Sequence, residues 1–291
     1  MEDADALAWC DGQVCAAKTV RIGPLDRSFL YGDSVFEVFR TYGGNPCQLE
    51  AHVARLEASA TQLRFVEVPP RTELMVAGAT LSASAYAHFG RDVYIRLLLS
   101  RGSGPIRYQL DDLGAPCLLG LALPLSPPDP ALYRIGAALR SMQVWRPADN
   151  VFALHTKSSN YLPHIMALDE ARRAGADDAL VLGPQGEVLE GSTSNVFWAR
   201  RGELFTPTSR LPILDGITRR TVLGCIERAG LTLHEGVYFP CDIYAADEVF
   251  ITSSIREVLP ITVLDGRPVG QGAPGPFSQH LLEAYRNEVC N

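Results

Sequence analysis

The chain has 291 residues, of which 47% are hydrophobic and 20% charged, and its formal net charge is −7. This composition is typical of a globular protein and excludes a fibrous or disordered chain. The acidic balance argues against general nucleic-acid binding, and no apolar run reaches the roughly 20 residues that a membrane helix needs.

The amino terminus and the cysteines indicate the compartment. The chain starts with the acidic stretch MEDADALAWC, which resembles neither a secretory nor a transit peptide. Its seven cysteines are scattered and never form a C-x-x-C pair, and its six histidines show no paired ligand spacing. We therefore expect reduced thiols in a cytoplasmic protein, and no metal site.

The first half of the chain alternates strand-like and helix-like segments. Apolar residues at helical spacing predict an amphipathic helix over residues 49–64, and a second helix follows the paired prolines 69 and 70. Strands are predicted, in order, over residues 18–23, 34–44, 92–104 and 116–125, the second ending in a Gly-Gly-Asn turn and the third in a glycine-rich loop.

The densest proline cluster, SPPDP at residues 126–130, cannot continue a helix or a sheet. A chain of this length is also long for one compact core. We therefore predict a small N-terminal α+β domain over residues 1–124, a proline-rich linker over 125–130, and a larger C-terminal domain over 131–291.

The second half mixes hairpins and helices. Its predicted elements are a helix over 160–177 with Pro163 in the first turn, hairpins over 178–191 and 194–207, a helix over 217–230, a strand–turn–strand over 247–266 and a helix over 277–289. This irregular alternation favours two α+β domains over a doubly wound parallel sheet.

Lysine is rare in this chain, and one of its two lysines stands in an unusual place. Only Lys18 and Lys157 occur, against 24 arginines. An arginine would serve equally well as a surface charge, but only a lysine can lose its proton and act as a nucleophile. Tyr161 follows four residues later, within reach of anything that Lys157 binds. Taken alone, a surface lysine ahead of a helix is the commoner case.

Two further motifs contain groups that could bind a ligand. In EGSTSN, Glu190 ends a strand, where its carboxylate could hold a protonated ring nitrogen. In DGITRR, Ile217 and Thr218 open a helix, and the N–H groups of a first helical turn beside a hydroxyl suit a phosphate. A solvated hairpin residue and an ordinary N-cap are the plainer alternatives.

Hydroxyls and a further cation could serve the same anion. ITSSI places Thr252, Ser253 and Ser254 between two apolar strands, and Arg55 lies on the first helix in AHVARLE. Polar turns are common without a ligand, and an arginine on a helix face often only extends over it. No single feature is decisive.

Together these segments resemble the pyridoxal-phosphate (PLP) enzymes of fold type IV, the family of branched-chain and D-amino-acid aminotransferases and aminodeoxychorismate lyase. The resemblance runs from LDRSFLYGDSVFEVFR to VFITSSIREVLPI with order and spacing preserved. It implies a two-domain α+β fold, with a small N-terminal domain and a larger C-terminal domain that has a barrel-like sheet and helices. It also implies PLP as cofactor and a homodimer, in which Tyr31 and the loop RGSGPIRY contribute across the interface.

The resemblance implies a role for each residue of the cofactor site. Lys157 matches the lysine that bonds to the cofactor's aldehyde and then moves the substrate proton. Glu190 matches the partner of the ring nitrogen, Tyr161 the partner of the ring oxygen, and Asn195 a brace of the loop. The phosphate cup would consist of Arg55, Ile217, Thr218 and Ser254, with Ser253 beside it. Asp215 departs from the family, which often has proline there, and places a carboxylate near the phosphate.

The resemblance also implies a substrate pocket. Its residues would be Tyr31, Phe36, Val38, Arg40, Tyr94, Arg96 and Arg107. Tyr31, Phe36, Tyr94 and Arg96 resemble the branched-chain pattern. Val38 departs from it, because branched-chain enzymes usually have glycine there. Arg107 resembles a carboxylate clamp of D-amino-acid enzymes, but Tyr108 stands near the place of their histidine; paired charges inside the fold are the alternative for Arg40, Arg96 and Arg107.

We therefore predict a PLP-dependent aminotransferase that moves an amino group from an apolar, branched-chain-like amino acid to a 2-oxo acid such as 2-oxoglutarate, in a ping-pong cycle. One alternative is a D-amino-acid or (R)-amine transaminase. Another is aminodeoxychorismate lyase, which Val38 disfavours because it offers no hydroxyl. A cofactor-binding protein without catalysis is disfavoured by Lys157 and Glu190 together.

Overall fold

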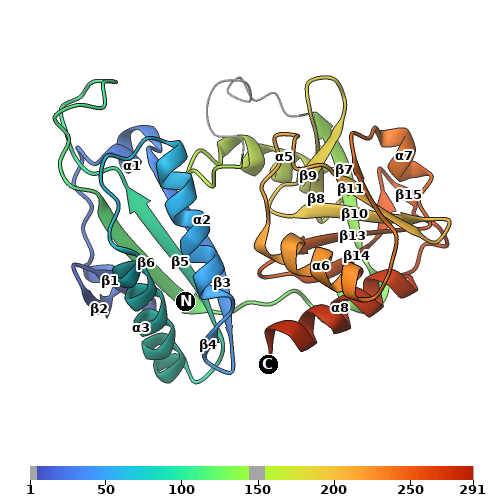
Figure 1. Cartoon of the computed structure of the whole chain (residues 1–291), viewed down its shortest axis with the longest axis horizontal. Coiled ribbons are helices and arrows are strands. Elements are labelled where there is room, and N and C mark those ends of the chain that lie inside the picture. Colours follow the sequence, from blue (N-terminus) through green and yellow to red (C-terminus); the bar gives the residue numbers. More distant parts are fainter. Residues whose placement is uncertain (1–4, 144–154, 291) are drawn as a thin grey trace. The chain divides into compact units, whose positions relative to one another are not determined.

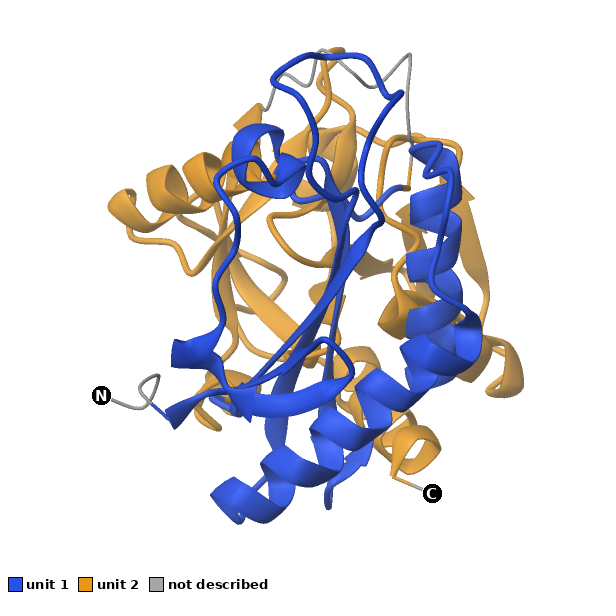
Figure 2. Cartoon of the chain, turned by 90° about the vertical axis from the view of Figure 1, so that its left-hand side faces the viewer, with its two compact units in different colours: residues 1–126, 156–160 blue, residues 127–155, 161–291 orange. Residues whose placement is uncertain are grey.

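The computed structural model describes residues 5–143 and 155–290. The chain forms two compact units, the first made of residues 1–126 and 156–160, the second of residues 127–155 and 161–291 (Figure 2). Residues 156–160, which contain Lys157, thus belong by their contacts to the first unit, although the second unit flanks them in sequence.

The first unit is a six-stranded antiparallel sheet with two long helices on one face (Figure 1). The strand order is β2-β1-β6-β5-β3-β4. The elements are β1 (Leu7–Cys10), β2 (Gln13–Ala16), a 3-10 turn (Ala17–Thr19), α1 (Arg27–Tyr31), β3 (Ser34–Tyr42), β4 (Asn45–Pro46), α2 (Leu49–Gln62), α3 (Arg71–Phe89), β5 (Val93–Ser100) and β6 (Cys117–Pro124).

Period-two alternation decides which face of this sheet is the core. Along β3, Val35 and Phe39 are fully buried against α2 and α3, and along β5 the same is true of Ile95 and Leu99. Successive side chains of a strand point to opposite faces. Phe36, Val38 and Arg40 of β3 and Tyr94 and Arg96 of β5 therefore lie on the other face, which carries much of the candidate site.

The second unit is built on a nine-stranded mixed sheet. Eight strands follow the order β12-β11-β10-β13-β14-β7-β8-β9, and β15 pairs with β14. The elements are α4 (Leu132–Ile135), β7 (Ala137–Gln143), α5 (Leu162–Arg173), β8 (Asp178–Leu182), β9 (Val188–Gly191), β10 (Asn195–Arg200), β11 (Glu203–Pro207), α6 (Ile217–Arg228), β12 (Leu233–Gly236), α7 (Pro240–Tyr244), β13 (Glu248–Ser253), β14 (Glu257–Leu264), β15 (Arg267–Pro268) and α8 (Pro276–Val289).

Both faces of this second sheet are covered. On one face Phe197 and Phe250 stack at 5.3 Å between ring centroids, in the cluster that contains residues of α6 and α8. On the other face Trp198 and Ile251 belong to a separate cluster with residues of α7. The N-terminal ends of β10 and α6 and the C-terminal end of β13 carry the candidate residues of this unit.

The two predicted hairpins, the strand–turn–strand, the predicted helices and the mixture of elements are confirmed, but the strand predicted over 18–23 is wrong. Lys18 lies in the 3-10 turn, and residues 20–23 have no regular structure. The strands come earlier, as the hairpin β1–β2. Its turn consists of Asp11 and Gly12, with φ values of 49° and 77°. Asp-Gly is the preferred pair for a two-residue turn with positive φ, so the signal was present.

The described residues lack two features, a membrane-spanning helix and a cluster of metal ligands. None of their helices is both long enough and apolar enough to cross a membrane. Nor do residues 5–143 and 155–290 contain a group of three His, Cys, Asp or Glu side chains arranged to hold a metal ion.

Candidate active site

Five of the predicted substrate residues share one face of the N-terminal sheet. Phe36, Val38 and Arg40 alternate along β3 with the buried core residues. The register between β3 and β5 places Arg96 directly opposite Val38, and Tyr94 directly opposite Arg40. Residues opposite each other on neighbouring strands point to the same side. The structure therefore brings together an aromatic, apolar and cationic surface from residues up to 60 positions apart in sequence.

Lys157 is fixed against the edge of this same surface. Its carbonyl oxygen accepts a hydrogen bond from the Phe36 N–H at 2.9 Å, and Ser158 bridges to Val35. Its own N–H donates to Ser59 Oγ on α2 at 3.3 Å. The backbone of residues 156–160 thus continues the sheet beyond β3.

Two cations face one aromatic ring. Lys157 Nζ lies 4.7 Å from the centroid of the Phe36 ring, and Arg96 Cζ lies 3.7 Å from it. The electron-rich face of an aromatic ring attracts cations. Phe36, Arg96 and Lys157 therefore form one group, which we call the Phe36 cluster, and it joins the predicted nucleophile to two predicted substrate residues.

Arg55 has a buried carboxylate partner that the sequence reading did not assign. Arg55 Nε and Nη2 donate to the two oxygens of Glu37, each at 2.7 Å, and His52 Nδ1 lies 2.7 Å from Glu37 Oε2. All three side chains are buried. Glu37 lies between Val35 and Phe39 on the same core face of β3. A carboxylate at such a position needs a basic partner. That signal could have been read from the sequence.

The charges of this buried group are decided by their neighbours. Burial alone raises the pKa of Glu37, but the Arg55 guanidinium and the hydrogen bonds from Arg55 and His52 outweigh it and lower the pKa to about 2. Burial lowers the pKa of His52, and the positive charges of Arg55 and Lys157 lower it further. The hydrogen bond and charge of Glu37 raise it, but the net shift is downward. His52 is therefore neutral at pH 7, and because an ionised carboxylate only accepts, its Nδ1 carries the hydrogen.

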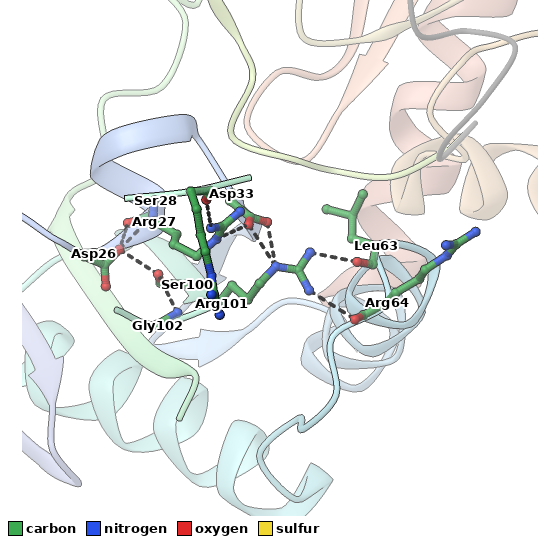
Figure 3. Close-up of polar contacts among 10 residues, drawn as sticks. Asp26, Arg27, Ser28, Asp33, Leu63, Arg64, Ser100, Arg101 and Gly102 are labelled. Carbon is green, nitrogen blue, oxygen red and sulfur yellow. Dashed lines mark hydrogen bonds and ion pairs between the residues drawn. The ribbon is translucent and has the colours of Figure 1, made fainter. Parts of the chain in front are cut away.

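Tyr31 and Arg107 lie in a second region of the first unit, organised by Asp33. Asp33 accepts hydrogen bonds from Arg27 Nε at 2.7 Å and from Arg101 Nε at 2.9 Å (Figure 3). Arg27 Nη1 also donates to the carbonyl of Arg107 at 2.9 Å. The network thereby ties α1, which ends at Tyr31, to the loop that carries Arg107.

The side chains of that loop are engaged locally. Arg107 Nη2 donates to Asp112 Oδ2 at 2.8 Å and lies 3.4 Å from Asp111 Oδ2. The rings of Tyr31 and Tyr108 are tilted against each other at 5.6 Å. Arg107 is thus paired with exposed carboxylates of its own loop, while Tyr31 stands beside the exposed Tyr108.

In the second unit, Glu190 and Asn195 converge on one peptide segment. Glu190 is 5% exposed, and its Oε2 accepts a hydrogen bond from the N–H of Leu214 at 2.9 Å. Asn195 Nδ2 donates to the carbonyl of Leu214 at 2.8 Å. Leu214 was not singled out from the sequence, because only its backbone takes part. It lies just before α6, so both predicted residues are tied to the start of that helix.

The N-cap residue of α6 is a glycine. Gly216 has no side chain with which to cap the turn formed by Ile217 and Thr218. A Cβ atom on Gly216 would lie 2.1 Å from Asn195 Oδ1, so only glycine fits there. Asp215, the residue that departs from the family, lies within ion-pair distance of Arg219 and Arg220, at 4.0 and 3.5 Å.

Two hydroxyls at the N-terminal end of β10 and the C-terminal end of β13 are buried. Thr252 is the cross-strand neighbour of Asn195, on the face where Phe197 stacks on Phe250 under α6. Thr252 is 1% exposed, and its Oγ1 has no hydrogen-bond partner among the described residues. Within the same described set, the Oγ of Ser194 is also buried and unsatisfied. The N–H groups of a first helical turn and unsatisfied hydroxyls both suit a phosphate-like anion.

The remaining predicted residues of the second unit lie at two turns. Ser253 ends β13 and pairs with Glu257 across the hairpin turn that contains Ser254. Ser253 Oγ accepts a hydrogen bond from the Arg256 N–H at 3.2 Å. Tyr161 is the N-cap residue of α5, and its ring stacks on His164 at 5.0 Å between centroids.

Comparison with known proteins identifies the family. The model of the family described as amino-transferase class IV matches residues 34–264. The chain belongs to the class IV aminotransferases. Among proteins similar to this aminotransferase, the D-alanine aminotransferase of Bacillus licheniformis is 32% identical over 91% of each chain. The branched-chain-amino-acid aminotransferase of Pseudomonas aeruginosa is 31% identical over 98% of this chain and 93% of its own.

A solved structure agrees with this assignment. The crystal structure of a branched-chain amino acid aminotransferase with pyridoxamine 5'-phosphate, from the organism abbreviated T.th., superposes with a TM-score of 0.89 and 30% identity, covering 98% of this chain and 94% of that one. The predicted family, the two-domain α+β fold, the enzyme class and the PLP cofactor are thereby confirmed. The start of α6 at Gly216 and the unsatisfied hydroxyls of Ser194 and Thr252 are groups of a kind that suits the phosphate of PLP.

Proposed function

We propose that this aminotransferase moves amino groups from amino acids with apolar, branched-chain-like side chains to a 2-oxo acid such as 2-oxoglutarate, in a ping-pong cycle. The observation that carries the proposal is the Phe36 cluster. It joins an amine, a guanidinium and an aromatic ring at 4.7 and 3.7 Å. The guanidinium of Arg96 suits a carboxylate, and the ring gives an apolar surface for the side chain of the donor.

Lys157 is the proposed catalytic residue. When bound, PLP acts as an electron sink that stabilises negative charge at the substrate α-carbon. Lys157 provides the amine that bonds to the cofactor's aldehyde, yields that place to the substrate amine, and then moves a proton from the α-carbon. An arginine could do neither, since its guanidinium keeps its protons in proteins.

The other cofactor residues have holding roles in the proposal. Glu190 provides the acidic partner of the ring nitrogen, Tyr161 the partner of the ring oxygen, and Asn195 braces the segment before α6. The proposed phosphate ligands are Arg55, Ile217, Thr218 and Ser254, with Ser253 beside them. Apart from Arg55, the residues proposed to hold the cofactor lie within the C-terminal domain of residues 131–291, although Lys157 belongs by its contacts to the first compact unit.

Val38 favours one second candidate. It lies directly opposite Arg96 on the surface that carries Phe36, where its branched side chain narrows the space. D-amino-acid transamination is therefore the alternative, and it agrees with the 32% identity to a D-alanine aminotransferase. Arg107, paired with two loop carboxylates, adds no support for a carboxylate clamp.

A panel of donors separates these activities. The purified enzyme with PLP is mixed with L-leucine, L-valine or D-alanine, and loss of the visible absorbance of bound cofactor is followed without and with 2-oxoglutarate. Conversion by L-leucine and L-valine supports the proposal. Response to D-alanine alone assigns the second candidate, and release of pyruvate from aminodeoxychorismate without an acceptor would show lyase activity instead.

The role of Lys157 has its own test. Reduction of the PLP-loaded enzyme with borohydride fixes the cofactor on its lysine, and digestion then gives one labelled peptide. We expect the label on the peptide that contains TKSSNY. The Lys157→Ala variant should carry no label and lose at least about 10⁴-fold in activity, whereas Lys18→Ala should behave as the wild type. Label on any other peptide would contradict the assignment.

The proposal includes a homodimer in the cytoplasm. Phe29 of α1 and Ile106 and Tyr108 of the loop between β5 and β6 are 71%, 74% and 86% exposed. Large exposed apolar side chains grouped on one surface are typical of protein interfaces. The seven scattered cysteines, none in a C-x-x-C pair, support the placement in a reducing compartment.

A further inference from the structure

Two hydroxyl-bearing segments of the second unit meet at the same end of the sheet. Residues 191–194 precede β10, and residues 253–256 begin at the last residue of β13; β10 and β13 are paired, with Asn195 opposite Thr252. The first segment contains Ser194 and the second contains Ser253 and Ser254. The hydroxyls of Ser194 and Thr252 are buried and, among the described residues, have no partner.

One arginine connects both segments. Arg256 Nη2 donates to Thr193 Oγ1 at 2.8 Å, in the first segment, and its backbone N–H donates to Ser253 Oγ at 3.2 Å, in the second. Its Nη1 donates to Asp178 Oδ2 at 2.6 Å. A planar guanidinium holds its donors in fixed directions, so two bonds from its ends define the distance between their acceptors.

Asp178 links Arg256 back to the first segment through Ser192. It is 1% exposed and begins β8. Its Oδ1 accepts a short hydrogen bond from Ser192 Oγ and another from the N–H of Ala179 at 2.7 Å. Three side-chain hydrogen bonds therefore link Ser192 to Asp178, Asp178 to Arg256 and Arg256 to Thr193, and the backbone between Ser192 and Thr193 completes the ring. We call this group the Arg256 clamp.

The clamp supplies rigidity and adds little net charge. The guanidinium of Arg256, 20% exposed, is matched by the buried carboxylate of Asp178 at 2.6 Å. Neither side chain is among the proposed phosphate ligands. The clamp fixes the position of two segments, of which the first carries the unsatisfied hydroxyl of Ser194 and the second directly follows that of Thr252. An anion that reaches these hydroxyls depends on their spacing.

We propose that Arg256, with Asp178, is a positioning residue that holds the segments 191–194 and 253–256 so that their hydroxyls bind the phosphate of PLP. The inference rests on the proposed function, since it requires that these segments form the phosphate site. It assigns to Arg256 a role that acts through Thr193, Ser192 and Ser253 and involves no contact with the phosphate itself.

The test compares a ligand with a phosphate and one without. Dissociation constants for PLP and for pyridoxal are measured on the wild type, Arg256→Lys, Asp178→Asn and Thr193→Val. We expect Arg256→Lys and Asp178→Asn to raise the dissociation constant for PLP about tenfold, which corresponds to the loss of one charge-assisted hydrogen bond. The dissociation constant for pyridoxal should change less than about twofold. The phosphorus NMR signal of bound PLP should shift in both. Thr193→Val, at an exposed position, removes one arm of the clamp and should give a smaller change in the same direction.

Matched controls separate positioning from general destabilisation. Arg228→Lys alters an arginine–carboxylate pair, to Glu288 at 2.8 Å, at the C-terminal end of α6. Asp265→Asn alters a partly buried carboxylate that accepts from Tyr244 and Ser141 after the far end of β14. Both controls should keep the wild-type ratio of PLP to pyridoxal affinity.

The outcomes distinguish this inference from the proposed function. Equal weakening of PLP and pyridoxal in the clamp variants, or no change in either, overturns the inference while the lysine label on the wild type leaves the proposed function intact. A wild type that binds no PLP overturns both. Should Arg256→Lys fail to fold, Thr193→Val gives the same comparison in a folded protein.

Discussion

At the scale of single residues, Glu37 illustrates how one buried carboxylate organises its surroundings. It holds Arg55 through two hydrogen bonds of 2.7 Å and orients the ring of His52. A guanidinium held at two nitrogens has a fixed plane, so Glu37 sets the direction of the arginine assigned to the phosphate. Removing one partner of a buried ion pair leaves the other without compensation, at a cost of about 3 kcal/mol or more.

Glu37→Gln is therefore expected to lower the free energy of unfolding by about 3 kcal/mol at pH 7. The folded-state pKa of Glu37, about 2, lies below its ordinary value of 4.5, so its contribution is complete above pH 4.5 and lost as the pH falls towards 2. The lowered pKa of His52 acts in the same direction, beginning below its ordinary value of 6.5. Urea unfolding of the wild type and the variant, from neutral pH down to about pH 2.5, measures this dependence.

The difference between wild type and Glu37→Gln should shrink as the pH falls from about 5 to about 2.5, because protonation removes the charge that the substitution removes. Glu50→Gln is the control, since Glu50 lies on the same helix α2 but its side chain is 81% exposed. It should change the unfolding free energy by less than about 0.5 kcal/mol. A wild-type-to-variant difference that is constant with pH would speak against an ionised Glu37.

Val38 is the residue at which donor specificity can be tested. Its side chain lies opposite Arg96, between Phe36 and Arg40 along β3. Val38→Gly removes the whole branched side chain there, and a difference of this size in an apolar pocket changes selectivity about 10- to 100-fold. We expect kcat/KM for L-leucine to rise relative to that for D-alanine, with Val38→Ala between the two. A ratio that moves towards D-alanine would refute the role of Val38 in limiting the pocket.

At the scale of elements, local signals were readable and distant pairings were not. The hairpin β8–β9, the hairpin β10–β11 and the start of α5 at Pro163 follow from turn residues and alternation within a few positions. Strand β7 was not predicted. It pairs in parallel with both β14 and β8, and parallel neighbours have no turn between them to mark the pair.

The start of α6 offers a test at this scale, because the helix and its N-cap contain two glycines in different surroundings. A Cβ atom on Gly216 would lie 2.1 Å from Asn195 Oδ1, whereas one on Gly224 would meet first the flexible end of Arg228, at 3.3 Å. Gly216→Ala should displace Asn195 from Leu214, lower the unfolding free energy by about 1–3 kcal/mol and weaken PLP binding at least about tenfold.

Gly224→Ala should instead raise the unfolding free energy by about 0.5–1 kcal/mol, as expected for glycine replaced inside a helix, with unchanged PLP affinity. Thermal unfolding and a fluorescence titration with PLP measure both effects on the same samples. Equal behaviour of the two variants would show that the contact between Gly216 and Asn195 does not shape the site.

At the scale of the whole molecule, the sequence indicated which residues could take part in catalysis better than it indicated which of them lie side by side. Lys157 stood out because lysine is rare in this chain, and Glu190 because of its place between a strand and a polar loop. The pairing of Val38 with Arg96 could not be derived, because two helices separate β3 from β5 and no turn fixes their register. Arg107 was assigned by motif position, and only the structure shows its loop partners.

The exposed apolar side chains of the first unit belong to the scale of the whole molecule, because only a second copy of the chain could bury them. Phe29, Ile106 and Tyr108 lie on α1 and the loop that the Arg27–Asp33–Arg101 network holds in place. Such side chains lose solvent contact only on association. We expect sedimentation of the wild type at the mass of a dimer.

The double variant Ile106→Asp, Tyr108→Ser should dissociate at least about 100-fold more readily, because a buried charge and the loss of an aromatic anchor each cost about 2 kcal/mol or more at an interface. The control is Val66→Asp, at a residue that is 89% exposed in the same unit but outside this group. It should leave the mass unchanged. The double variant should also lose activity at low enzyme concentration and recover it as the concentration rises, which monomers with complete sites would not do. Sedimentation of the double variant as a tight dimer would assign the interface to another surface.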